Sequence, residues 1–218
     1  MDDLSNEAVQ RTSQILTTEH FTLQGARNAT ISEANGRLGH YLSTVGSAVV
    51  AMAFVANVSE MGLVFLAFSC VIFPIMIVLG IVTLIRTLQI AVDFTRLTQA
   101  INRIRHYYIE VAPEAEAYIS FPQFDDLQAV RQSTTPAHSR LQDLASTPGP
   151  IMLINSVLVG VFAGILTNGF LSADLGLAIV VALVALVVAF VLHRIYVHRF
   201  WEQWARQDLD VRFPASES

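Results

Sequence analysis

Four stretches of apolar residues dominate the hydropathy pattern of the chain. A bilayer core about 30 Å thick requires roughly 20 apolar residues per spanning helix, and all four stretches reach or approach that length. The pattern therefore predicts an all-α, four-span helical membrane protein. The spans are expected at about 41–58, 62–85, 151–170 and 174–193.

Composition supports the same class. Of the 218 residues, 53% are hydrophobic and only 14% are charged, and the mean hydropathy is +0.52. These values lie outside the range of an ordinary soluble domain. The first forty residues are polar and contain no apolar stretch of the length that a signal peptide needs.

The positive charges are distributed on one side of the predicted spans. All 13 cationic residues are arginines, and the two short connections that follow spans one and three carry only Glu60 and Asp174. Because cytoplasmic segments are enriched in cations, both termini and the central segment are expected in the cytoplasm, with the spans in the cell (inner) membrane. The arginines lie at positions 11, 27 and 37, then 86, 96, 103, 105, 131 and 140, and finally 194, 199, 206 and 212.

This topology makes a direct prediction. Reporter fusions at residues 1, 120 and 218 should give cytoplasmic signals, whereas fusions at residues 60 and 172 should give external signals. An external signal at residue 120 would remove the basis for a sensor on the cytoplasmic side.

The spans divide the chain into five predicted segments, three of them outside the membrane. Segments 1–40 and 87–150 are expected to contain helices. The last segment contains the aromatic sequence "HRIYVHRFWEQW", which is typical of an interfacial belt. The segments are a cytoplasmic N-terminal region (1–40), a first transmembrane hairpin (41–86), a cytoplasmic helix and loop (87–150), a second hairpin (151–193) and a cytoplasmic tail (194–218).

Apolar residues at heptad spacing continue beyond the second span. The intervals are 4, 3, 4, 3 and 4, and neither glycine nor proline occurs between Gly80 and Pro113. Span two is therefore expected to continue as one helix to about Val111, and similar spacing from Ile31 to Met52 predicts a continuous helix through span one. The seam and the small-residue faces of the spans also predict a homo-oligomer. The seam residues are Ile90, Phe94, Leu97, Ile101, Ile104 and Tyr108.

A second stripe on this helix carries cations and aromatic rings, most densely in "NRIRHYY". A guanidinium forks onto phosphate, and an aromatic ring can stack on a base, so the stripe suggests recognition of an anionic, planar ligand. A solvated helix face with local ion pairs and lipid headgroup anchoring are the alternatives. The candidate ligand-binding residues are Arg96, Arg103, Arg105, Tyr107 and Tyr108.

The small-residue faces of the spans predict where helices approach closely. Lipid supplies no hydrophobic drive between helices, so close packing must hold them together. The faces comprise Ser43 with Ser47, Gly160 with Gly164, and Ala178, Ala182, Ala185 and Ala189.

No residue pattern points to catalysis. The sequence contains no P-loop, GxGxxG, GxSxG, HExxH or CxxC motif. His193 and His198 are five residues apart, the wrong interval for two metal ligands on one helical face. Asp125 and Asp126 are interpreted as turn or N-cap residues rather than as a catalytic pair. We therefore expect neither an enzyme nor a cofactor, metal or nucleic-acid partner.

The helix "ISEANGRLGHYLSTVGSAVVAMAFV" enters the bilayer unbroken, turns within four residues and returns as a long cytoplasmic helix. This layout, over about residues 20–110, resembles the Pycsar-type antiphage membrane effectors, which are activated by cyclic pyrimidine mononucleotides. Those effectors often have an Asp-Ala-Lys stretch before the first span, where this chain has Glu33-Ala34-Asn35-Gly36. The resemblance implies a bacterial effector that binds a cyclic nucleotide on its cytoplasmic side and impairs the membrane.

Two other functions fit the same pattern. The chain could be a structural or scaffolding membrane protein whose helical stalk binds a cytoplasmic protein partner. It could also be a small oligomeric channel without a nucleotide ligand. A nucleotide cyclase encoded beside the gene would favour the effector over the scaffold.

Overall fold

The computed structural model describes residues 2–134, 147–171, 173–207 and 210–215. Arg140, one of the thirteen arginines, lies outside the described residues. Throughout the described ranges the regular elements are helices, with no strand. In chain order they are α1 (Asp2–Val58), α2 (Leu63–Val111), the 3₁₀-helix η1 (Pro113–Tyr118), α3 (Leu127–Thr134), α5 (Pro148–Leu171) and α6 (Leu175–Gln207).

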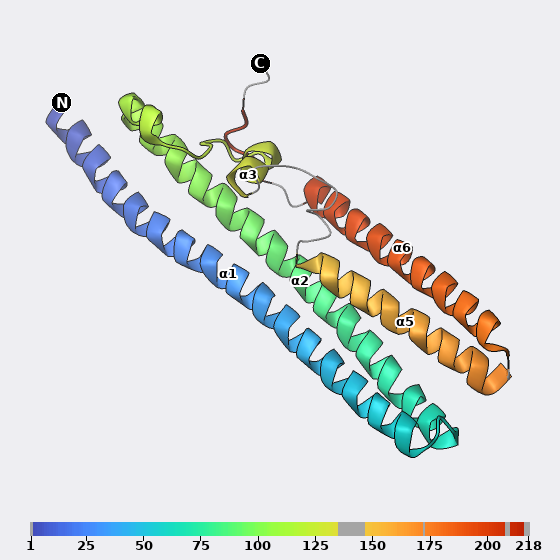
Figure 1. The fold of residues 1–218 in the computed structure, drawn as a ribbon. Coiled ribbons are helices and arrows are strands. Elements are labelled where there is room, and N and C mark those ends of the chain that lie inside the picture. The colour runs from blue at the N-terminus through green and yellow to red at the C-terminus, as the bar shows by residue number, and fades with distance from the viewer. Residues whose placement is uncertain (1, 135–146, 172, 208–209, 216–218) are drawn as a thin grey trace. The chain divides into compact units, whose positions relative to one another are not determined.

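Four of these helices, α1, α2, α5 and α6, are long and apolar enough to cross a membrane (Figure 1). Each contains one of the four predicted spans, so the prediction of an all-α protein with four spanning helices is confirmed. The predicted continuity is also confirmed: α2 runs without a break past Pro74 to Val111, and α1 is helical from Asp2 to Val58.

The connection between α1 and α2 is a tight turn over residues 59–62. Glu60 and Met61 both have left-handed backbone conformations, with φ of 50° and 59°. The amide of Gly62 donates to the Ser59 carbonyl at 2.8 Å, and a Cβ on Gly62 would lie 3.0 Å from that oxygen. Two successive left-handed residues reverse the chain direction within this short turn, so that α1 and α2 can pack antiparallel.

The chain divides into two compact units. The first unit comprises residues 1–33, 89–139 and 208–218, and the second unit comprises residues 34–88 and 140–207. Helices α1 and α2 contribute to both units. Each unit therefore contains a segment of the same two continuous helices.

The core of the second unit is built by all four long helices. One buried cluster contains Tyr41 of α1, Leu84 and Leu88 of α2, and Ile151 and Met152 of α5, and Val197 and Phe200 of α6 pack against it. A second cluster contains Phe73, Met76 and Leu158, and the rings of Phe73 and Phe162 stack with centroids 5.4 Å apart.

Helices α5 and α6 approach closely through small residues. A Cβ on Gly160 would lie 2.7 Å from the Ala182 carbonyl oxygen, and one on Gly164 would lie 3.1 Å from the Ala182 Cβ and 3.2 Å from the Ala178 carbonyl oxygen. The predicted use of Gly160, Gly164, Ala178 and Ala182 in helix packing is thus confirmed. By contrast, Ser43 and Ser47 are exposed on the single chain.

A polar cluster lies inside the second unit, on the inner faces of its helices. The Asn155 amide and the Ser156 hydroxyl contact the His193 ring at 3.3 and 3.2 Å. Gly80 leaves room for the cluster, because a Cβ there would lie 2.4 Å from Asn155 Oδ1 and 2.8 Å from the Tyr41 hydroxyl. Polar contacts of this kind fix helices against one another in an apolar surrounding.

In the first unit, the heptad seam of α2 lies on the packed side of the helix. Ile90, Ile101 and Ile104 are buried, and the other three seam residues are half-buried. On α1 the predicted seam was wrong at Ile31, whose side chain is 45% exposed. The half-buried residues Arg27, Thr30 and Ala34 form the packed stripe instead. They are spaced three and four residues apart and therefore lie on one face of the helix.

Candidate functional site

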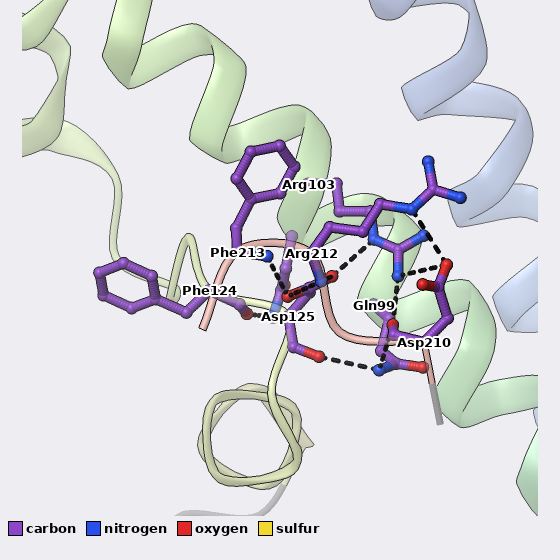
Figure 2. Close-up of polar contacts among 8 residues, drawn as sticks. Gln99, Arg103, Phe124, Asp125, Asp210, Arg212 and Phe213 are labelled. Atoms are coloured by element: carbon purple, nitrogen blue, oxygen red, sulfur yellow. Dashed lines mark hydrogen bonds and ion pairs between the residues drawn. The ribbon is translucent and has the colours of Figure 1, made fainter. Parts of the chain in front are cut away.

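The first unit contains a buried carboxylate, Asp125, between η1 and α3 (Figure 2). Its Oδ2 accepts a hydrogen bond from Arg103 Nε of α2 at 2.6 Å and one from the Arg212 amide at 2.9 Å. Its Oδ1 accepts from the Phe213 amide at 2.8 Å. A fully buried charge with donors on both oxygens, one of them a guanidinium, is the arrangement in which a carboxylate tolerates burial.

Two amide side chains of α2 hold the loop that carries Asp125. Gln99 Nε2 donates to the Asp125 carbonyl oxygen and Asn102 Nδ2 donates to the Phe124 carbonyl oxygen, both at 2.8 Å. Gln99 and Asn102 are themselves buried and lie one turn apart on α2. The loop is therefore fixed by side chains on one face of a rigid helix.

The C-terminal residues 210–215 complete this arrangement. Asp210 forms an ion pair with Arg103 at 3.2 Å, and the Phe213 ring stacks on His106 with centroids 4.4 Å apart. The Ala215 amide donates to Asp126 Oδ2 at 2.9 Å. We call the contacts that Asp125, Asp126 and the α2 side chains make with residues 210–215 the C-terminal clamp.

Asp126 also caps α3, because its Oδ1 accepts from the Ala129 amide at 2.9 Å. The interpretation of Asp126 as an N-cap is confirmed. Burial by itself would raise the pKa of Asp125, but hydrogen bonds from the Arg212 amide, Arg103 and the Phe213 amide outweigh it and hold that pKa below its usual range. The carboxylate is thus ionised in the folded clamp.

The structure separates the predicted ligand-binding residues. Arg96 is exposed and makes no hydrogen bond or ion pair with the described part of the chain. Arg103 belongs to the C-terminal clamp. Tyr107 packs edge to face against Tyr108, with centroids 6.2 Å apart. Arg105 and Tyr108 do not belong to this clamp, since their hydrogen bonds are to Asn102 and Thr17.

Arg105 lies beside aromatic and amide groups and has no acidic partner among the described residues. Its Nη1 donates to Asn102 Oδ1 at 2.6 Å, and its guanidinium carbon lies 5.2 Å from the centre of the Phe121 ring. The Tyr108 hydroxyl shares a hydrogen bond with Thr17 Oγ1 of α1 at 3.2 Å, and its ring centroid lies 6.3 Å from that of His20. Tyr108 therefore joins α2 to α1.

Helix α1 contributes two further basic side chains next to these residues, His20 and Arg27. The Arg27 guanidinium carbon lies 5.8 Å from the centre of the Phe94 ring, and its Nε is buried without a partner. Gln24 Nε2 donates to His20 Nε2 at 2.7 Å, which places the proton of the neutral imidazole on Nδ1. That nitrogen is also buried without a partner. We call His20, Arg27, Arg105 and Tyr108 the α1/α2 cationic cluster.

Like charges act on each other in this cluster. Burial lowers the pKa of Arg105, and the charge of Arg27 lowers it further. Burial likewise lowers the pKa of His20, with smaller contributions from Arg105 and Arg27. Two guanidinium groups beside an imidazole, without a neutralising carboxylate among the described residues, are suited to bind an anion.

The sequence patterns did not single out His20 and Arg27. A signal was nevertheless present: followed backwards from Ala34, spacings of 4, 3, 3 and 4 residues lead through Thr30 to Arg27, Gln24 and His20. Polar and cationic side chains at packed positions need hydrogen-bond or charge partners, whereas those on a solvated face are satisfied by water.

The fold defines an all-helical protein with four helices long and apolar enough to cross a membrane, as in a multi-pass membrane protein. The first two of these helices also contribute to the first unit. No protein-family model, no curated protein and no solved structure matches the chain.

Proposed function

We propose that this protein is a bacterial membrane effector of antiphage defence, activated by a cyclic nucleotide on its cytoplasmic side and impairing the membrane. The observation that carries the proposal is the continuity of α1 and α2, each of which contributes one segment to each unit. A change in how the two helices pack in the first unit acts on backbones that are continuous with two spans. Helices transmit such changes as small shifts and rotations.

The composition of the first unit favours an anionic ligand. Arg27 and Arg105 form no ion pair with the residues that the structure describes. Aromatic rings lie beside both guanidinium groups, at Phe94 and Phe121. A nucleotide combines an anionic phosphate with a planar base, and therefore matches both kinds of group. A ligand that binds one packing of α1 and α2 better than another shifts the population between them.

The test is co-expression in a bacterial host with a nucleotide cyclase, against a catalytically inactive cyclase as the control. We expect the active cyclase to cause rapid loss of membrane potential, measured with a voltage-sensitive dye, only when this protein is present. An unchanged potential with cyclases that make each of the common cyclic mononucleotides would contradict the proposal. Capture of one host protein in constant stoichiometry, without any loss of potential, would support a scaffold instead.

A further inference from the structure

The α1/α2 cationic cluster contains donors that no group among the described residues uses. Arg27 Nε and His20 Nδ1 are both buried and unpartnered. An unmade hydrogen bond at a buried donor costs about 1–3 kcal/mol, and more at a charged group. The like charge of Arg105 adds repulsion. An occupant that supplies several acceptor oxygens and a negative charge would remove both costs.

We propose that His20, Arg27 and Arg105 form a binding site for a phosphate group, with Tyr108 and Phe121 as its aromatic border. Arginine binds phosphate oxygens through paired N–H donors, and a neutral imidazole N–H adds one more. The residues come from both long helices, so a bound phosphate links α1 to α2. This inference rests on the proposed function only for what binding does to the membrane. The binding of phosphate is measured separately.

The phosphate could belong to a soluble molecule or to a lipid headgroup. Arg27 precedes Tyr41, where the first span begins, by 14 residues, which is about 21 Å along α1. The headgroup layer is only about 5–8 Å thick on each side of the hydrocarbon core. The length of the helix thus favours a soluble phosphate compound, and the experiment separates the two sources.

Binding should also change the protonation of His20. The charged and titratable groups that act on its ring are Arg27 on its own helix and Arg105 and Tyr108 on α2. A phosphate offsets the charge of the two arginines, and the Gln24 amide can rotate to accept from Nε2. The pKa of His20, lowered in the free protein, should therefore rise when phosphate binds, and affinity should increase as the pH falls through the range in which His20 titrates.

The experiment uses the full chain in phosphatidylcholine nanodiscs. Inorganic phosphate is titrated against chloride at matched ionic strength, and binding is followed by calorimetry and by the NMR titration of His20. We expect saturable binding and an upward shift of the His20 pKa. Arg27→Ala and Arg105→Ala should each weaken binding about ten- to a hundredfold, and Arg27→Lys should restore part of it. Arg11→Ala, at an exposed arginine of α1, should leave binding unchanged.

The outcomes are distinct. A shift of the His20 pKa that appears with phosphatidylglycerol nanodiscs, without added phosphate, assigns the site to a lipid headgroup. Equal weakening by Arg11→Ala, or a His20 pKa that responds to neither phosphate nor phosphatidylglycerol, would overturn the site. The protein could fail the phosphate test and still cause loss of membrane potential when the cyclase is expressed. That result would overturn this site but support the proposed function, with the ligand bound elsewhere.

Discussion

Asp125→Asn is expected to release the C-terminal clamp. The carboxylate accepts from Arg103 and from the amides of Arg212 and Phe213. An asparagine keeps the shape but turns one acceptor into a donor and removes the charge that pairs with Arg103. Breaking a buried ion pair by removing one partner costs roughly 3–5 kcal/mol, and the partial exposure of Arg103 favours the lower end of that range.

Hydrogen exchange measures this release directly, because the reporting amides belong to the clamp itself. We expect protection of the Arg212 and Phe213 amides to fall at least a hundredfold, since about 1.4 kcal/mol corresponds to a factor of ten. The matched control is Asp93→Asn, an exposed aspartate of α2 outside the clamp. Unchanged protection of both amides in Asp125→Asn would show that the carboxylate does not hold the segment.

Acid should have the same effect on the wild-type protein. The pKa of Asp125 is lower in the clamp than in an open chain. Its contribution to stability is therefore complete above the open-chain pKa of about 4 and is lost as the pH falls through the lower, folded value. The Arg212 and Phe213 amides should lose protection in that acidic range, and Asp125→Asn should remove the pH dependence of these two amides.

The spans and their continuity could be predicted because they depend on local properties. Length and apolarity define a spanning helix, and the absence of breakers after Gly80 predicts that α2 continues to Val111. The small-residue faces of α5 and α6 could be predicted for the same reason, since close helix packing needs small residues at regular spacing. All of these signals lie within single helices.

The clamp could not be predicted, because it depends on residues far apart in the sequence. Arg103 was assigned to a ligand from its neighbours on the helix, whereas its partners Asp125 and Asp210 lie 22 and 107 residues further along. The candidate ligand-binding residues Arg96, Arg103, Arg105, Tyr107 and Tyr108 remain a prediction. The structure adds His20 and Arg27 of α1 beside Arg105 and Tyr108, a pairing that only the antiparallel packing of the two helices reveals.

The predicted oligomer was inferred partly from the seam of α2, and the structure changes what a mutation there would test. Ile101 is fully buried within a single chain. An aspartate at this position would place a charge in the core of the first unit and disrupt its folding. Association of copies has to be measured on the intact protein in a mild detergent.

Gly160→Leu is expected to separate α5 from α6 and strongly destabilise the second unit. A Cβ at position 160 would lie 2.7 Å from the Ala182 carbonyl oxygen and 3.3 Å from the Leu186 amide nitrogen. These are backbone atoms of α6, so no change of side-chain rotamer can relieve the overlap and the helices must move apart. Overpacking by a methylene group costs about 1–3 kcal/mol, and a whole leucine side chain should cost more.

Thermal unfolding in nanodiscs provides the measurement, with Gly46→Leu as the matched control. Gly46 lies in the first span, and a Cβ there would meet no atom within 4 Å apart from its own turn of helix. Leucine at position 160 should therefore lower the Tm of the protein by several degrees or prevent folding. Leucine at position 46 should change the Tm little. Equal effects at the two positions would mean that α5 and α6 do not meet at Gly160, and would contradict the packing of the second hairpin.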